Sequence, residues 1–118
     1  MLLLAGLAGA AGVALAAGAS HAAAGALLEP ASRMLLVHAP LYLFLAFALR
    51  WRPRSIFAGI GLVLTLGLLL FCGDLLARAF AGTRLFPFAA PLGGSLLILT
   101  WVGVAAAGLA WFRKTRDG

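Results

Sequence analysis

Two histidines and one aspartate are the residues of this sequence that could do chemistry. His21, His38 and Asp74 lie within or beside long apolar stretches, where ionisable side chains are costly to place. Imidazoles on adjacent helices at one depth can ligate a haem iron or contact a quinone, which makes His21 and His38 weak candidates for cofactor binding. The sequence has no HExxH motif, Walker loop or G-x-S-x-G elbow. We therefore expect no catalytic residue, no metal ligand and no cofactor.

Asp74 has a cationic neighbour at helical spacing. Arg78 follows it by four residues, the order that favours an ion pair on a helix. The simplest interpretation is an anchoring pair in which Arg78 reaches toward the lipid headgroups. Alternatively, Asp74 joins His21 or His38 in a buried hydrogen-bond network, or forms a proton or ligand site. Because Ser95 is predicted at a similar depth, we expect His21, His38, Asp74, Arg78 and Ser95 to form a structural polar cluster.

The composition indicates that most of the chain is surrounded by lipid. Its 118 residues are 64% hydrophobic and 10% charged, with a mean hydropathy of +1.12. The single cysteine, Cys72, excludes an intrachain disulfide and a cysteine metal motif, and is predicted to be a small buried residue. The formal charge is +6, but the basic residues lie at the ends of apolar runs. We therefore expect contact with a lipid bilayer and no nucleic-acid partner.

Four apolar segments have about the length that a membrane-spanning helix needs. They predict an all-α membrane protein, a four-transmembrane-helix bundle in one domain (1–118), with spans at about 2–26, 34–49, 55–81 and 89–112. The start of the first span resembles a secretory signal without its positive end, so we expect it to stay uncleaved. Polar residues from Glu29 to Arg33 predict a turn. Pro40 removes a helix N–H and predicts a kink in the second span.

Small residues within these segments predict close helix packing. Gly6, Ala10, Ala14, Ala17 and His21 recur at helical spacing on one stripe of the first span. This pattern predicts that His21 points into the bundle. The glycines expected to pack against other helices are Gly6, Gly18, Gly67, Gly73, Gly93 and Gly94.

Basic residues are distributed unevenly between the two sides that four spans create. One side carries six of them: Arg50, Arg52, Arg54, Arg113, Lys114 and Arg116. The other side carries Arg33 and Arg84, with Arg78 if its side chain reaches that surface. By the positive-inside rule, both termini are predicted to be cytoplasmic (N-in/C-in), with the turns at 29–33 and 82–88 facing outward.

Short motifs along the chain carry a family resemblance. They are Gly18-Ala19-Ser20-His21, His38, Leu70-Phe71-Cys72-Gly73-Asp74, and Ala90-Pro91-Leu92-Gly93-Gly94 followed by Trp101. In order and spacing they resemble the small four-helix membrane proteins of the domain-of-unknown-function 423 family, also called UPF0382. The resemblance extends nearly end to end. It implies four membrane helices and adds no activity, because the family has no established biochemical function.

The sequence departs from that family pattern at several polar positions. Ser20 stands where the family usually has alanine, Cys72 and Asp74 stand where it has serine, and Ala90 replaces a threonine. If those hydroxyl groups share a role in the family, this chain has altered it.

Three functions fit the sequence. The first is a structural or accessory component that packs with itself, as a homo-oligomer, or with a larger membrane complex through small-residue faces. The second is a small transporter or channel subunit, which would need oligomerisation or repeated halves. The third is a haem- or quinone-associated redox subunit. The high usage of Ala, Gly, Leu and Arg indicates a multi-pass protein of a bacterial inner membrane.

Overall fold

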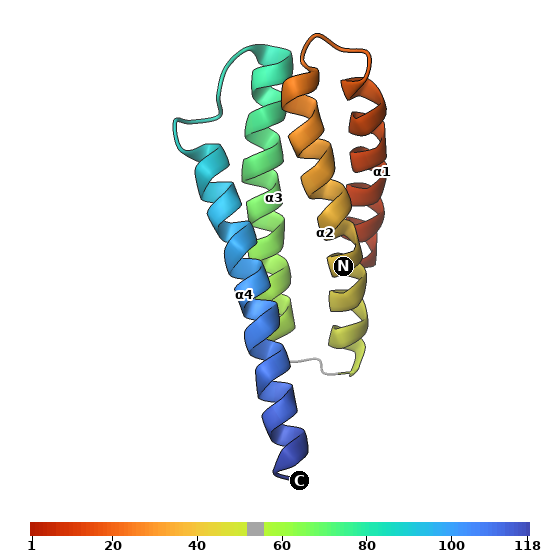
Figure 1. Ribbon diagram of the computed structural model, residues 1–118, viewed down its shortest axis with the longest axis vertical. Helices are drawn as coiled ribbons and strands as arrows, with labels where there is room; N and C mark the ends of the chain where they lie inside the picture. The colour runs from red at the N-terminus through yellow and green to blue at the C-terminus, as the bar shows by residue number, and fades with distance from the viewer. Residues whose placement is uncertain (52–55) are drawn as a thin grey trace.

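The computed structural model describes residues 1–51 and 56–118, and these fold into four α-helices (Figure 1). The helices are α1 (Leu2–Ala19), α2 (Gly25–Trp51), α3 (Ile56–Ala81) and α4 (Ala89–Arg116). Each is long and apolar enough to cross a membrane. The predicted all-α class with four such helices is therefore confirmed.

The helices run up and down in chain order, and each packs against its neighbours in sequence (Figure 1). α2 and α3 form the middle of the bundle, while α1 and α4 lie at its edges. In the apolar 18-residue stretch of each helix, 33% of α2 and of α3 is buried, against 17% of α1 and 11% of α4. The outer helices therefore turn most of their surface away from the bundle, and this surface is as apolar as the core.

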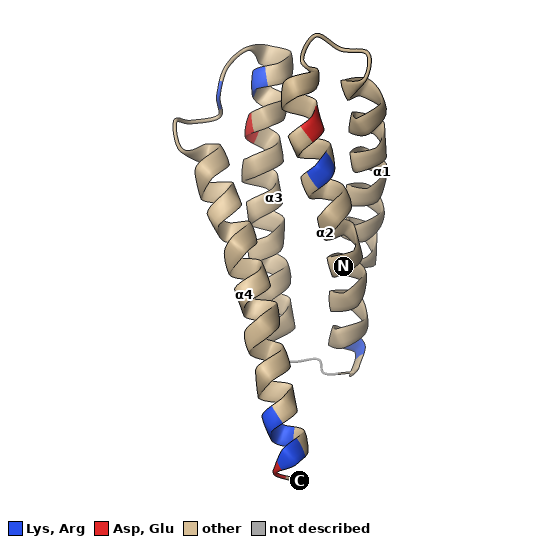
Figure 2. Cartoon of the chain, viewed as in Figure 1, with Lys and Arg blue, Asp and Glu red and all other residues tan. Residues whose placement is uncertain are grey.

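The two ends of the bundle differ in charge and in connections. The 20–24 and 82–88 connections lie at one end, and the C-terminal end of α4 lies at the other (Figure 1). We call residues 12–38 and 67–100 the turn half, and residues 39–51, 56–66 and 101–116 the basic half. Figure 2 shows acidic and basic segments together in the turn half, and a cluster of basic segments at the C-terminal end of α4.

The first connection lies earlier in the chain than predicted. α1 ends at Ala19 instead of near residue 26, and α2 begins at Gly25 instead of residue 34. An 18-residue helix is already about 27 Å long, close to the hydrocarbon thickness of a bilayer, so α1 needs no further turn. The alanines of 22–24 have high helix propensity, but that propensity does not decide where this helix stops.

The polar residues predicted as the first turn belong to α2. Glu29 and Arg33 form an exposed ion pair on successive turns of this helix, 2.7 Å apart. Pro30 lies between them without ending the helix. Ala31 and Ser32 are buried against other helices, and their packing offsets the backbone bond that Pro30 cannot make. The expectation of a turn at 29–33 was therefore wrong.

The later helix bounds agree more closely with the sequence. α3 ends at Ala81, as expected, and Gly82 takes a positive φ of 70°, which suits a helix C-terminus and costs glycine little. α4 begins at Ala89, as expected, but continues to Arg116 instead of ending near residue 112. The expected start of the third span, Ser55, lies outside the described residues, as do Arg52 and Arg54.

The apolar core follows the middle of the bundle. Leu45 of α2 and Leu64 of α3 are fully buried, and Ile60 and Leu68 lie on the same stripe of α3. α2 continues through Pro40, whose ring is exposed. The kink at Pro40 stays a prediction.

Candidate functional site

Asp74 is a buried carboxylate that binds a backbone amide. It lies in α3 with 1% of its surface exposed, and its Oδ1 accepts a hydrogen bond from the Leu85 N–H at 2.9 Å. Its Oδ2 lies 3.8 Å from Nη1 of Arg78, a looser contact. The carboxylate therefore fastens the 82–88 connection to α3, and the expected ion pair with Arg78 is the weaker of its two contacts.

His38 is buried in the middle of α2 with both ring nitrogens engaged. Nδ1 lies 2.7 Å from the Met34 carbonyl oxygen, and Nε1–H of Trp101 in α4 donates to Nε2 at 3.1 Å. Because an indole N–H can only donate, Nε2 must be the acceptor, which leaves the proton on Nδ1 to donate to Met34. His38 is thus a neutral imidazole that joins α2 to α4.

The two histidines lie at different depths. His38 is 13 residues from Gly25 and 13 from Trp51, about 20 Å along the helix from its start. His21 is exposed in the 20–24 connection, two residues beyond the end of α1. The expectation that His21 points into the bundle at the depth of His38 was therefore wrong, because α1 ends and α2 begins earlier than predicted. This arrangement does not place two imidazoles around one haem iron.

Ser95 completes the set of residues that the sequence singled out. Its hydroxyl is exposed and donates to the Pro91 carbonyl oxygen at 2.9 Å. His38 of α2 and Ser95 and Trp101 of α4 are among the residues that line a largely apolar cleft of about 550 Å³. Asp74 lies apart from it, with no hydrogen bond to either histidine among the described contacts. The expected single cluster is thus divided into separate contacts.

Two further hydrogen bonds between helices were not predicted. Ser32 Oγ donates to the Gly12 carbonyl oxygen at 2.7 Å and joins α2 to α1. The Tyr42 and Thr65 hydroxyls lie 2.7 Å apart and join α2 to α3. The only signal in the sequence was the spacing of Tyr42, which is four residues after His38 and so shares its helix face.

Cys72 also joins two of the helices. It is buried, as predicted, and its Sγ lies 3.6 Å from the Ala31 carbonyl oxygen of α2. A thiol is a weak donor, so this contact contributes packing more than bond strength.

α3 and α4 approach each other closely at two glycines. A methyl group on Gly93 would press against the backbone nitrogen of Phe71 and lie 2.8 Å from the Gly67 carbonyl oxygen. A methyl group on Gly67 would in turn lie 3.1 Å from the Gly93 carbonyl oxygen. These two glycines therefore allow the backbones to touch, in the manner of small residues at membrane helix interfaces.

The other predicted packing glycines are less tightly enclosed. A methyl group would lie 3.4 Å from Leu85 at Gly73, 3.8 Å from Phe71 at Gly94 and 4.0 Å from Leu28 at Gly18. Gly6 is exposed, with nothing within 4 Å of that position. Gly12, which the sequence did not single out, would bring a methyl group to 2.7 Å from Leu36.

The polar side chains are used to hold helices together. Within residues 1–51 and 56–118, no buried side-chain nitrogen or oxygen lacks a hydrogen-bond partner. The same residues contain no group of three or more potential metal-ligating His, Cys, Asp and Glu side chains. The arrangement accounts for these residues as structural contacts.

Comparison with known proteins gives a family and no activity. The family model described as "Protein of unknown function (DUF423)" matches residues 5–94, which include α1, α2, α3 and the beginning of α4. No curated protein and no solved structure gives a significant match. The matched region contains both partners of the Asp74, Ser32, Tyr42 and Cys72 contacts, whereas Ser95 and Trp101 lie beyond its end. With four helices able to cross a membrane and a match over most of its length, this chain belongs to the DUF423 family of proteins of unknown function.

Proposed function

We propose that the chain is a structural or accessory membrane protein that packs with itself or with a larger membrane complex. The observation that carries this proposal is the use of the buried polar side chains. His38, Asp74 and Ser32 each form a hydrogen bond with another segment of the chain. Their polar groups therefore stabilise the bundle. What the bundle offers to other molecules is its outer apolar surface.

The outer face of α1 supports this role. Gly6, Ala10, Ala14 and Ala17 recur on one stripe, and all four are exposed. The sequence predicts that such small-residue faces pack with another copy or with a larger complex, but it also predicts that His21, on the same stripe, points into the bundle. An outward stripe of small residues lets a helix of another molecule approach closely, which favours association in lipid.

Assembly can be measured by native mass in a mild detergent after extraction from the host membrane. We expect the chain to run as a complex, and leucine at Gly6 or Ala10 to weaken that complex because it separates the backbones. Leucine at Ala105, an exposed small residue of α4, is the control. A monomer without co-purified protein, or equal effects of all three substitutions, would contradict the proposal.

The proposed orientation places both termini in the cytoplasm, in a bacterial inner membrane. Arg50 lies in the last turn of α2, and Arg113, Lys114 and Arg116 lie in the last turn of α4. Figure 2 shows basic segments at the end of the bundle that carries the C-terminus. Arg52 and Arg54 add to this side by their place in the sequence between α2 and α3. Under the positive-inside rule, this side faces the cytoplasm.

Reporter fusions test this orientation. A reporter at Gly118 should give a cytoplasmic signal, and one inserted in the 20–24 connection should give an external signal. The opposite pair of signals would overturn the orientation, while leaving the assembly experiment unaffected.

A further inference from the structure

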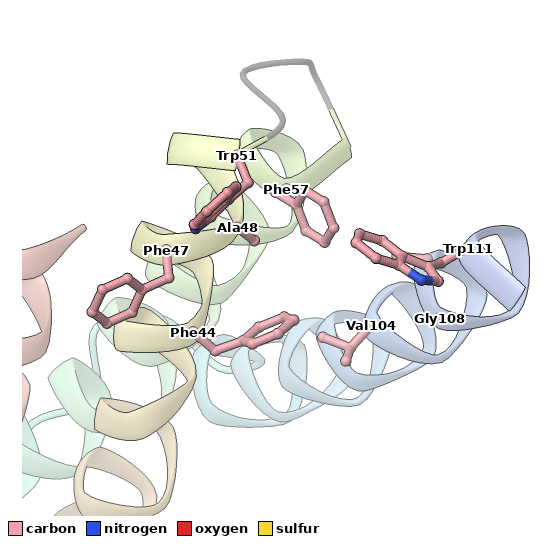
Figure 3. Close-up of a pocket in the computed structure, with 9 residues that line it drawn as sticks. Phe44, Phe47, Ala48, Trp51, Phe57, Val104, Gly108 and Trp111 are labelled. Atoms are coloured by element: carbon pink, nitrogen blue, oxygen red, sulfur yellow. The ribbon is translucent and has the colours of Figure 1, made fainter. Parts of the chain in front are cut away.

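An aromatic cleft of about 440 Å³ lies between α2 and α4 in the basic half. Figure 3 shows Phe44 of α2, Phe57 of α3 and Trp111 of α4 turned toward one space, and Phe47 and Trp51 of α2 also line the cleft. The rings of Phe44 and Phe57 meet edge to face, with centroids 6.2 Å apart and an interplanar angle of 83°. The cleft has the volume of a small-molecule pocket, and apolar groups make up nearly all of its lining.

Basic residues lie close in sequence to the ends of α2 and α4 that line this cleft. Arg50 directly precedes Trp51, and Lys114 lies three residues after Trp111, which places it on the same face of α4 one turn further out. Arg113 adjoins Lys114, and all three basic side chains are exposed. The apolar lining thus ends at positive charge, at the level where aromatic residues meet lipid headgroups.

This combination fits a molecule with a long apolar part and an anionic head. We propose that the cleft binds an acyl chain of one anionic phospholipid, whose phosphate contacts Lys114, Arg113 and Arg50. An acyl chain is flexible enough to fill an irregular space between aromatic rings, and the positive rim selects a negative headgroup over a neutral one. The proposal goes beyond the structural role above and does not depend on it.

A second protein helix fits this cleft less well. Membrane helices approach one another through small residues, whereas here Phe47 and Trp51 project from α2 with 61% and 82% of their surfaces exposed. These rings would hold a partner backbone away from the cleft floor. That floor includes Gly108, which has open space where a side chain would start.

The glycines on either side of the basic half provide matched variants. Gly108→Leu places a side chain inside the cleft without a clash. Gly59→Leu places the same side chain on α3. A Cβ at Gly59, as at Gly108, would have no other atom within 4 Å, and Gly59 does not line the cleft. Arg113→Gln combined with Lys114→Gln removes two charges at the rim and leaves the lining intact.

Lipid retention is measured by native mass spectrometry with phosphatidylglycerol and phosphatidylcholine of identical acyl chains. We expect the wild type to retain phosphatidylglycerol preferentially, Gly59→Leu to behave like it, and Gly108→Leu to lose the retained lipid. The double glutamine variant should lose affinity by roughly 25-fold, about fivefold for each charge.

Three results would overturn the proposal. The first is equal retention of the two lipids by the wild type. The second is equal retention of phosphatidylglycerol by the Gly108 and Gly59 variants. That result would mean that the lipid binds through its headgroup alone and that no acyl chain occupies the cleft. The third is a bound protein, without lipid, that Gly108→Leu displaces. The double glutamine variant keeps the test decisive if Gly108→Leu does not fold, because its substitutions lie on exposed residues at the end of α4.

Discussion

In the turn half of the bundle, side chains hydrogen-bond from one segment to another. Ser32 binds the backbone of α1, and Asp74 binds the 82–88 connection. In the basic half, the described contacts are mainly apolar: Leu45, Ile60 and Leu64 fill the core, and beyond them lies the aromatic cleft. The bonds from His38 to Trp101 and from Tyr42 to Thr65 lie near the border between the halves.

This difference separates two ways of holding helices in lipid. A polar contact between helices contributes only about 0.6 kcal/mol on average, but it has a fixed geometry and so sets the register of the helices. Apolar packing has no such direction, and lipid tails compete with it. We therefore expect single substitutions in the turn half to disturb the bundle more than matched ones in the basic half.

Two glycines of α4 test that comparison most strongly. Gly93→Ala should destabilise the protein by about 3 kcal/mol, because its methyl group meets the rigid backbone of α3 at Phe71. Gly103→Ala in the basic half meets only the Ile60 side chain, at 3.1 Å, which can move. Since alanine also favours the helix, we expect a change within about 1 kcal/mol there. Unfolding in SDS, followed by circular dichroism, measures both; equal losses would break the comparison.

Asp74→Ala should have the next largest effect, about 2 kcal/mol, because it leaves the Leu85 N–H without its acceptor. His21→Leu is the control, since His21 is exposed outside the helices and should change stability by less than about 0.5 kcal/mol. If His21 pointed into the bundle, as the sequence suggested, the order of these two losses would be reversed. Thermal unfolding in detergent decides between them, and a larger loss for His21→Leu would restore the original interpretation.

Trp101→Phe probes the border between the halves. It removes the donor to Nε2 of buried His38, and we expect a loss of about 1.5 kcal/mol. Trp51→Phe, at an exposed ring, should cost less than about 0.5 kcal/mol. Chemical unfolding is followed by circular dichroism, because replacing a tryptophan would change a fluorescence signal directly. If the two variants are equally stable, the His38 bond does not hold α2 to α4.

Ser32→Ala should lower the stability by about 1 kcal/mol, less than Gly93→Ala, Asp74→Ala or Trp101→Phe. The hydroxyl it removes is a buried donor to the Gly12 carbonyl oxygen, which keeps its place in α1. Ser95→Ala removes a bond within its own helix and should be nearly neutral. A shift in thermal midpoint for Ser32→Ala alone would sharpen the comparison, and equal midpoints would show that this contact adds no stability.

The sequence predicted the features that depend on local composition. Hydropathy and length identified four helices, and the Gly82 and Ala89 boundaries followed from turn and helix-start signals. The small-residue pattern identified Gly67 and Gly93, where the backbones of α3 and α4 approach closely. The motifs pointed to the DUF423 family, which the match over 5–94 confirms.

The tertiary structure decided what depends on partners far away in the chain. Asp74 had Arg78 as a neighbour at helical spacing, but its closest contact is Leu85, eleven residues away and brought near by the return of the chain. The position of the first turn was equally non-local, because burial of Ala31 and Ser32 keeps a proline-containing segment helical. α2 begins nine residues earlier than predicted, which puts His38 at mid-helix, and α1 ends about seven residues earlier, which leaves His21 outside the helices. Local sequence therefore determined which segments are helical, and packing between helices determined where they end and which side chains meet.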